Sequence, residues 1–341
     1  MAIPYSRMFF GLVPWYSLLI VCGILLAIFL GEKEAARKGL AKDTVIDTAL
    51  AAVPCGIVGA RLYYVAMTWE AFAKNPISIL YIWEGGIAIY GAVIGGAIGV
   101  WLCARRKKLP FLQLCDVVVS GLLLAQAIGR WGNYFNMEAY GPVITDGRFQ
   151  FFPVGVLIPE GGTYVWHMAT FFYESLWNGL GFLALWRLRK TTRRHGDLFA
   201  WYLLIYGSGR FIIEQLRQDS LYIGSLRASQ YLSLFLCIAA MIWLLGQKNK
   251  QGLISALLLA ARWFALQNPW LYGALLAAAL ILGLTSSLKN RICLMIAAIA
   301  DGAGVMLFVL GVPLSAAFAL GVHTVLCSLT LPLAVWGLQR D

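Results

Sequence analysis

A guanidinium, two amides and a carboxylate lie within one short stretch of an otherwise apolar sequence. Residues 129–141 read GRWGNYFNMEAYG and contain Arg130, Asn133, Asn136 and Glu138. Arginine and amide groups donate directional hydrogen bonds that suit a phosphate, and glycines allow its close approach to the backbone. A charge at the end of a membrane span is costly unless paired or hydrated, which makes it a functional candidate. The stretch predicts an anion site; the alternative is an internal salt bridge with amide caps.

A second group of charges occurs at Arg210, Glu214 and Arg217. On a helix these positions share one face, at i, i+4 and i+7. The group follows another apolar run and is predicted to reach the same external interface as the first stretch. We interpret it as a second part of the anion site, and the alternative is a solvated ladder of charges. Arg61 and Arg262 are the other arginines within or at the ends of apolar runs.

Glycine recurs every four residues at Gly91, Gly95 and Gly99. This spacing is typical of a small-residue seam that lets two membrane helices approach closely, so a structural role is predicted. Tyr90 stands at the outward end of the seam and could present its hydroxyl to a site. An interfacial aromatic anchor is the alternative role for that tyrosine.

The composition places these residues in a membrane protein. Of the 341 residues, 60% are hydrophobic and 13% are charged, and the mean hydropathy is +0.75. A transmembrane helix needs about 20 apolar residues. Apolar runs precede Gln247 at 12–30, 46–67, 84–103, 112–130, 171–186, 197–212 and 229–246. Further runs follow at 252–267, 270–287, 292–311 and 314–336.

We therefore predict an all-α integral membrane protein, a polytopic bundle of about seven core spans and about four C-terminal spans. The predicted domains are a core at 1–246 and a hydrophobic extension of unknown function at 247–341. Lysine and arginine cluster in every second connection, which predicts an external amino terminus and an internal carboxyl terminus. The external stretch 137–168, with alternating residues around 148–156, predicts a small extracytoplasmic cap.

Several classes of function find no support in the sequence. The net charge of +11 is divided among short clusters between apolar runs, so no nucleic-acid surface is predicted. The seven cysteines and three histidines are scattered without the spacing of a metal site, so we expect no metal and no cofactor.

The chain resembles the prolipoprotein diacylglyceryl transferases of bacteria between about residues 15 and 245. The family signature G-R-x-G-N-F-x-N-x-E-x-x-G is reproduced at 129–141, with Tyr134 where the family usually has phenylalanine. Further matching segments are 15–16, 59–61, 85–96, 173–174 and 210–217.

The resemblance implies an enzyme that transfers a diacylglyceryl group from phosphatidylglycerol to the lipobox cysteine of a prolipoprotein signal peptide. A thioether forms and glycerol 1-phosphate leaves. The nucleophile then belongs to the protein substrate, in keeping with the absence of a hydrolase-like nucleophile and base pair. The implied location is the bacterial cytoplasmic membrane, among membrane lipids.

The resemblance also implies roles for individual residues. Arg130 and Arg210 would hold the phosphate, while Glu138 and Tyr90 complete the proposed catalytic set. The implied substrate-binding residues are Tyr16, Arg61, Asn133, Asn136, Gly141, Glu214 and Arg217. Glu138 and Glu214 would fix the arginines or receive a proton, whereas Tyr16 and Gly141 are matching positions only.

Besides Tyr134, the chain departs from the family pattern in two segments. Tyr90 stands where many members have a histidine, and its unperturbed pKa of about 10 makes it a poor base at neutral pH, so the identity of the base is open. Met168 and Ala169 replace a usual His-Pro pair. The alternatives are a catalytically impaired family member that acts as a membrane scaffold, and an anion transporter.

Overall fold

The computed structural model describes residues 7–217, 222–223, 226–246, 249–265, 268–283, 299 and 316–339. The chain divides into two compact units. The first unit contains residues 1–24, 123–192 and 200–341, and the second contains residues 25–122 and 193–199. Residues on both sides of Gly246 therefore belong to the first unit.

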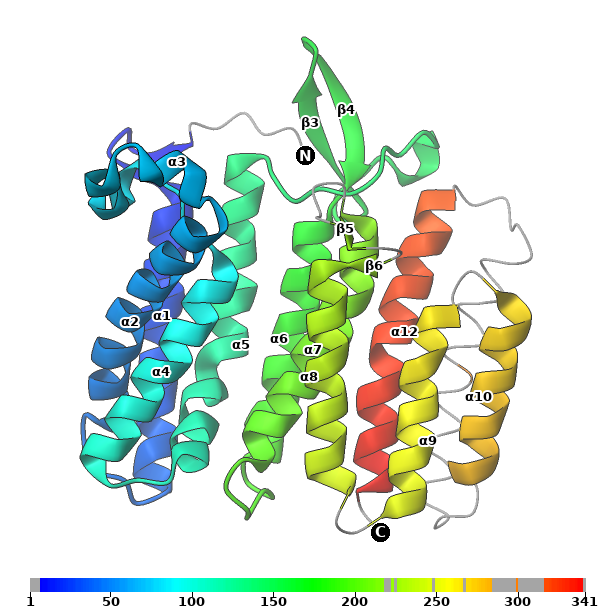
Figure 1. Cartoon of the computed structure of the whole chain (residues 1–341). Helices are drawn as coiled ribbons and strands as arrows, with labels where there is room; N and C mark the ends of the chain where they lie inside the picture. Colours follow the sequence, from blue (N-terminus) through cyan, green and yellow to red (C-terminus); the bar gives the residue numbers. More distant parts are fainter. Residues whose placement is uncertain are drawn as a thin grey trace. The chain divides into compact units, whose positions relative to one another are not determined.

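The structure confirms an all-helical, multi-pass membrane protein. Within the described residues, 5 helices are long and apolar enough to cross a membrane. They are α1 (Trp15–Arg37), α2 (Thr44–Met67), α5 (Phe111–Asn136), α8 (Ala228–Leu245) and the Gly321–Leu338 part of α12 (Ala316–Leu338) (Figure 1). The helices α4 (Ile89–Lys107), α6 (Thr170–Leu188) and α7 (Asp197–Ile213) complete the seven helices that match the predicted core spans.

The second unit is built on the close contact between α2 and α4. A Cβ atom added at Gly91 would lie 2.2 Å from the carbonyl oxygen of Gly59, and one added at Gly95 would lie 2.2 Å from that of Cys55. This backbone contact confirms the predicted glycine seam. Helix α4 begins five residues later than the predicted run because Gly85 and Gly86 have φ of 88° and 70°, which no right-handed helix allows.

Short elements connect α2 to α4. The connection contains α3 (Trp69–Ala73), η1 (Pro76–Leu80) and η2 (Ile82–Glu84).

A buried carboxylate holds the opposite end of the second unit. At the start of α5, Asp116 accepts hydrogen bonds from the backbone N–H groups of Gly196 and Phe199 at 3.0 and 2.8 Å. It also pairs with Lys38 at 3.2 Å, so one carboxylate ties three segments together.

In the first unit, an antiparallel hairpin forms the predicted cap. Its strands are β3 (Gly155–Glu160) and β4 (Thr163–Met168), and it projects beyond the end of α6 (Figure 1). The alternating residues at 148–156 do not form a strand over most of that stretch. The short helix η3 (Gly147–Phe149) and a turn around Pro153 occupy it, because proline has no N–H for a strand ladder. Two minor hairpins join β1 (Met8–Phe9) to β2 (Val13–Pro14) and β5 (Tyr222–Ile223) to β6 (Leu226–Arg227).

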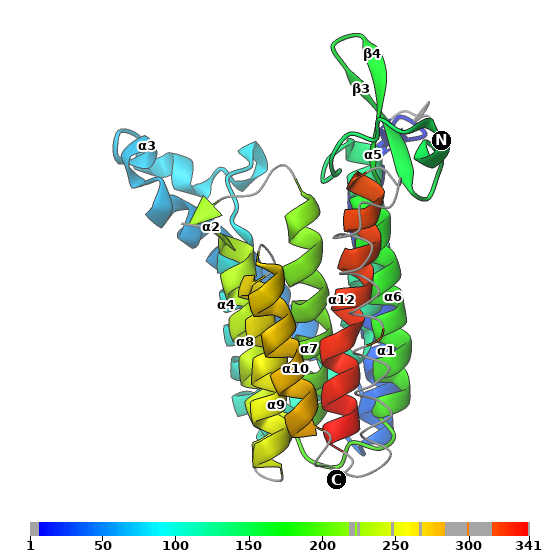
Figure 2. The same ribbon diagram turned by 90° about the vertical axis from the view of Figure 1, so that its right-hand side faces the viewer.

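The C-terminal helices continue the first unit. Helix α9 (Lys250–Ala261) runs into η5 (Arg262–Ala265) and is followed by α10 (Pro269–Gly283) and α12; Figure 2 shows α8, α9 and α10 side by side. Phe211 of α7 stacks on Trp263 of η5, with ring centroids 4.5 Å apart. Arg262 is fully buried, donates to the hydroxyl of Thr330 and lies near the ring of Tyr272. The predicted span at 292–311 lies outside the described residues except for position 299.

Candidate functional site

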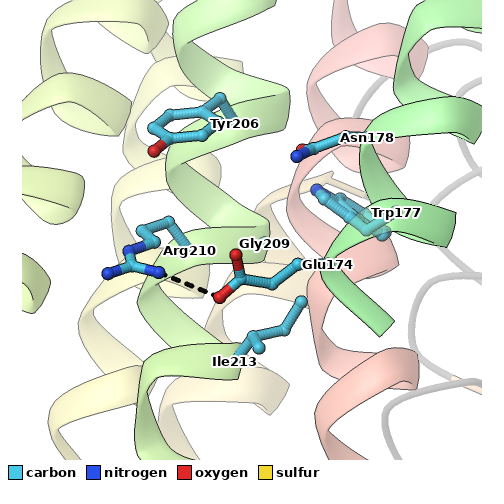
Figure 3. Close-up of a pocket in the computed structure, with 7 residues that line it drawn as sticks. All are labelled: Glu174, Trp177, Asn178, Tyr206, Gly209, Arg210 and Ile213. Carbon is cyan, nitrogen blue, oxygen red and sulfur yellow. Dashed lines mark hydrogen bonds and ion pairs between the residues drawn. The ribbon is translucent and has the colours of Figure 1, made fainter. Parts of the chain in front are cut away.

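Three helices of the first unit bring two arginines to one buried glutamate. Arg130 extends from α5, Glu174 from α6 and Arg210 from α7. The two carboxylate oxygens of Glu174 take different partners: Oε2 pairs with Nε of Arg130, and Oε1 accepts from Nη1 of Arg210 at 2.9 Å. Figure 3 shows Arg210 and Glu174 facing each other between α6 and α7. The predicted convergence of Arg130 and Arg210 is thus present in the structure.

Two further charges complete this arginine–glutamate cluster, defined here as Arg130, Glu174, Arg210, Glu214 and Arg217. Nη2 of Arg210 pairs with Oε2 of Glu214 at 2.7 Å. Nη1 of Arg217 lies 3.9 Å from Oε1 of Glu174. The three charges converge, but the predicted helical face is wrong for Arg217, because α7 ends at Ile213, η4 covers Glu214–Leu216, and Arg217 is extended.

The cluster is electropositive and partly open. Three guanidinium groups and two carboxylates leave one net positive charge. The arginine side chains are 14–21% exposed, whereas those of Glu174 and Glu214 are 6% and 4% exposed. An incoming anion therefore meets guanidinium groups first, with the carboxylates behind them. Such an arrangement suits a phosphate, because each guanidinium carries five N–H donors.

Sequence reasoning did not name Glu174 as a site residue, although the structure makes it the centre of the cluster. A signal was present in the sequence. Glu174 is the one carboxylate in the predicted span 171–186, and it belongs to a segment that matches the family. A buried carboxylate in a span requires cationic partners, so the rule that selected the arginines also applies to Glu174.

A small recess lies beside the cluster between α6 and α7. Its volume is about 10 Å³, close to the space of one water molecule, and Figure 3 shows the residues that line it. They are Glu174, Trp177, Asn178, Tyr206, Gly209, Arg210 and Ile213. The recess thus begins at the charged cluster and continues along the two helices toward Asn178 and Tyr206.

The amides and the carboxylate of the 129–141 stretch are more dispersed than predicted. Asn133 follows Arg130 by nearly one turn of α5 and is 8% exposed. Asn136 ends α5 and donates to Glu138 at 3.4 Å. Glu138 is exposed and forms no ion pair with an arginine among the residues that the structure describes. The structure therefore places Glu138 outside the arginine–glutamate cluster.

Gly141 and Tyr16 both lie in close packing contacts. The N–H of Gly141 donates to the carbonyl of Met168 at 2.9 Å, and its carbonyl contacts Nδ1 of His167 at 2.8 Å. A Cβ at Gly141 would lie 3.0 Å from the carbonyl oxygen of Leu216, so the glycine lets the hairpin meet the end of η4. The ring of Tyr16 lies over Gly132, where a Cβ would come within 2.6 Å of it.

Arg61 and Tyr90 belong to the second unit. All five N–H donors of Arg61 reach backbone carbonyls at 2.6–3.3 Å. The accepting residues are Ser78, Ile79, Tyr81, Gly85 and Gly86. Tyr90 is the second residue of α4, and its ring centroid is 6.1 Å from that of Tyr63.

Comparison with known proteins establishes the family. The model of the prolipoprotein diacylglyceryl transferase family matches residues 8–246. This chain belongs to that family. The match includes every residue of the arginine–glutamate cluster and ends where the hydrophobic extension begins.

Curated prolipoprotein diacylglyceryl transferases give the same result. The phosphatidylglycerol–prolipoprotein diacylglyceryl transferase of Halalkalibacterium halodurans is 42% identical over 252 residues, which cover 70% of this chain and 85% of the relative. The enzyme of the same name from Shouchella clausii is 43% identical over 254 residues, covering 70% and 90%. That of Enterococcus faecalis is 43% identical over 252 residues, covering 72% and 90%.

Family membership makes the chain a transferase of the membrane. The names of these relatives give no support to an anion transporter or to a scaffold without activity. Within the described residues, no group of three or more histidine, cysteine, aspartate or glutamate side chains could hold a metal ion.

Proposed function

We propose that this chain transfers the diacylglyceryl group of phosphatidylglycerol to the lipobox cysteine thiol of prolipoproteins. The carbon–oxygen bond between the diacylglyceryl group and the phosphate breaks, a thioether forms, and glycerol 1-phosphate leaves. The convergence of Arg130 and Arg210 on Glu174 carries the proposal, because it provides a positively charged place for the lipid phosphate at the end of the spans.

The cluster favours the transition state by its charge. The phosphodiester of the lipid carries one negative charge, and a second develops on the oxygen that leaves with glycerol 1-phosphate. Fixed donors aimed at developing charge lower the barrier, and they are most effective where water is scarce. Glu174 and Glu214 hold Arg130 and Arg210 in place before the lipid arrives. Arg217 adds a third cation that the phosphate can attract.

The thiol must lose its proton as the new bond forms. A free cysteine has a pKa near 8.5, so a proton acceptor increases the reactive thiolate fraction at neutral pH. We propose Glu138 as a candidate acceptor, since its exposed carboxylate is not occupied by an arginine. Tyr90 is proposed to handle protons as a hydrogen-bond donor, because its pKa in water is about 10. For Tyr90 the proposal rests on its position alone, where many members of the family have a histidine.

The remaining substrate contacts are proposed from position. Asn133 and Asn136 lie on α5 beyond Arg130 and offer amide donors to the headgroup hydroxyls. Tyr16 and Gly141 shape the surroundings of α5 and η4 by packing. Arg61 is proposed to act through the loop that its five hydrogen bonds organise, because those bonds use all its donors.

We further propose that the enzyme resides in the bacterial cytoplasmic membrane, with its amino terminus outside and its carboxyl terminus inside. The alternation of basic clusters supports this orientation. The proposed partners are phosphatidylglycerol and a prolipoprotein signal peptide that presents its lipobox cysteine. Residues 1–246 are proposed as the catalytic core, with 247–341 as an appended extension.

Purified protein, phosphatidylglycerol vesicles and a lipobox peptide test this function. We expect the peptide to gain the mass of one diacylglyceryl group, and Arg130→Ala to abolish that gain while still inserting into membranes. Arg148→Ala is the matched control, because Arg148 is 65% exposed in the cap and pairs with Asp146. Absence of product from the unaltered protein would favour the inactive scaffold, and full activity of Arg130→Ala would refute the site.

A further inference from the structure

The recess beside the arginine–glutamate cluster contains two polar groups that the proposed mechanism does not use. Asn178 of α6 is 3% exposed, and its amide forms no hydrogen bond with any residue in the described part of the chain. The hydroxyl of Tyr206 of α7 likewise has no hydrogen-bond partner among the described residues. An amide of a buried side chain that has no protein partner usually meets a ligand or water.

The two groups lie one helical turn from the charged cluster. Asn178 follows Glu174 by four residues, and Tyr206 precedes Arg210 by four. Figure 3 shows Asn178 and Tyr206 at one level of the recess and Glu174 and Arg210 at the next. Four residues of helix correspond to about 6 Å. Since α6 leads away from the cap hairpin and α7 leads toward it, the Asn178 level lies farther from the cap.

Hydrogen bonds and ring stacking fix the side chains around Asn178 and Tyr206. The indole of Trp177 donates to the carbonyl of Ile205 at 2.9 Å, so its only donor is used. The ring of Tyr206 stacks on that of Tyr202, with centroids 5.8 Å apart and an angle of 8°. The hydroxyl of Tyr202 accepts from Gln126 at 3.0 Å. Among the described residues that line the recess at this level, Asn178 and Tyr206 are the ones whose polar atoms remain for a ligand.

We propose that Asn178 and Tyr206 form a subsite for the acyl ester carbonyls of the lipid substrate. This inference rests on the proposed function. With the phosphate at Arg210, the ester carbonyls follow within the length of the glycerol backbone, a distance comparable to one helical turn. The Asn178 amide and the Tyr206 hydroxyl each donate to a carbonyl oxygen. The pair is a specificity determinant that selects ester-linked diacyl lipids over ether-linked lipids.

Replacing the lipid carbonyls tests the subsite directly. Transfer to a lipobox peptide is measured with dioleoyl phosphatidylglycerol and with its di-O-oleyl ether analogue, which differs only in lacking the carbonyls. We expect kcat/KM of the unaltered protein to be about 10-fold higher for the diester, a ratio that corresponds to about 1.4 kcal/mol. Asn178→Leu and Tyr206→Phe should each reduce this preference by lowering the rate with the diester and leaving that with the diether unchanged.

An exposed leucine of α6 provides the control for this test. Leu176→Ala changes a side chain of α6 that is 49% exposed and should keep the 10-fold preference. Equal use of the two lipids by the unaltered protein, or an equal loss with both lipids in the variants, would overturn the subsite. Should Asn178→Leu fail to fold, Tyr206→Phe and the lipid comparison still decide. Failure to transfer from either lipid would instead count against the proposed function, and competition of the two lipids for binding would then test the subsite.

Discussion

Arginine side chains enter the helical regions of both units, but their hydrogen-bond partners differ. In the second unit, the donors of Arg61 end on five backbone carbonyls, and the residue is 6% exposed. In the first unit, Arg130 and Arg210 pair with carboxylates and remain 21% and 18% exposed. The carbonyls around Arg61 belong to one folded loop, so a ligand could take their place only if the loop opened.

The comparison refines the rule that a charge within a membrane span is a functional candidate. An arginine saturated by backbone carbonyls is best understood as the organiser of a loop. The cluster arginines differ, because they are shared between carboxylates, carry excess positive charge and are partly exposed to solvent. Such an arginine can bind an anion while the surrounding structure stays folded. The partners of the guanidinium, and not its depth alone, separate the two roles.

Loss of Arg210 should have the largest effect on activity. Arg210→Ala removes the cation that joins Glu174 to Glu214, and we expect kcat/KM for phosphatidylglycerol to fall by about 10²–10³-fold, as for other fixed donors to developing charge. Initial rates of transfer to a lipobox peptide measure this. A loss smaller than that of Arg61→Ala, each corrected for folded protein, would reverse the contrast between the two units.

Neutralising the central carboxylate should have a smaller but still large effect. Glu174→Gln leaves Arg130 and Arg210 without their shared counter-charge, so we expect a loss of about 10–100-fold in kcat from misplaced donors. Breaking a buried charge pair also destabilises a protein by about 3–5 kcal/mol, which should lower the thermal midpoint in detergent. Unchanged kcat would show that Glu174 does not position the arginines.

Removal of the Arg61 side chain should reduce the stability of the fold more than the activity of the folded protein. Arg61→Ala leaves backbone carbonyls of residues 78–86 without their donor, and we expect a stability loss of about 2–4 kcal/mol. The specific activity of the fraction that stays folded should fall by less than that of Arg210→Ala. Thermal unfolding and transfer rates on the same preparation measure both quantities. Intact stability with lost transfer would instead place Arg61 in direct contact with substrate.

Deletion of residues 248–341 should have the smallest effect on catalysis. It removes the Trp263 ring that stacks on Phe211 and the helix α12, whose Gly321 lies against Met168. No member of the arginine–glutamate cluster is lost, so we expect activity to be retained and the thermal midpoint to fall. A truncated protein that inserts stably but is inactive would show that the extension takes part in catalysis.

The sequence predicted the helical elements and much of the cluster, because each depends on local patterns. The apolar runs match seven core helices, and the spacing of Arg210, Glu214 and Arg217 anticipated their convergence. The sequence marks Glu174 as a carboxylate within a span, but it does not show that Glu174 is the centre of the cluster, because its partners come from α5 and α7, far away in sequence. The boundary at Gly85 and the turn around Pro153 show that local backbone chemistry overrides hydrophobic patterns.

The position of Arg61 illustrates what the sequence could not reveal. Its type and its place in an apolar run resemble those of the cluster arginines. Only the folded connection between α2 and α4 brings five carbonyls around it. The distinction between a loop organiser and an anion-binding residue therefore depends on contacts that form between distant segments.

The seam between α2 and α4 has a consequence for how a lipid can enter. Where carbonyls of one helix face glycines of the other, backbone lies directly against backbone, and few side chains can repack if the helices slide or rotate. The two helices should therefore move as one rigid body. Any gate that opens for a two-chained substrate must then use a boundary other than this one, and a cross-link between α2 and α4 should leave turnover intact.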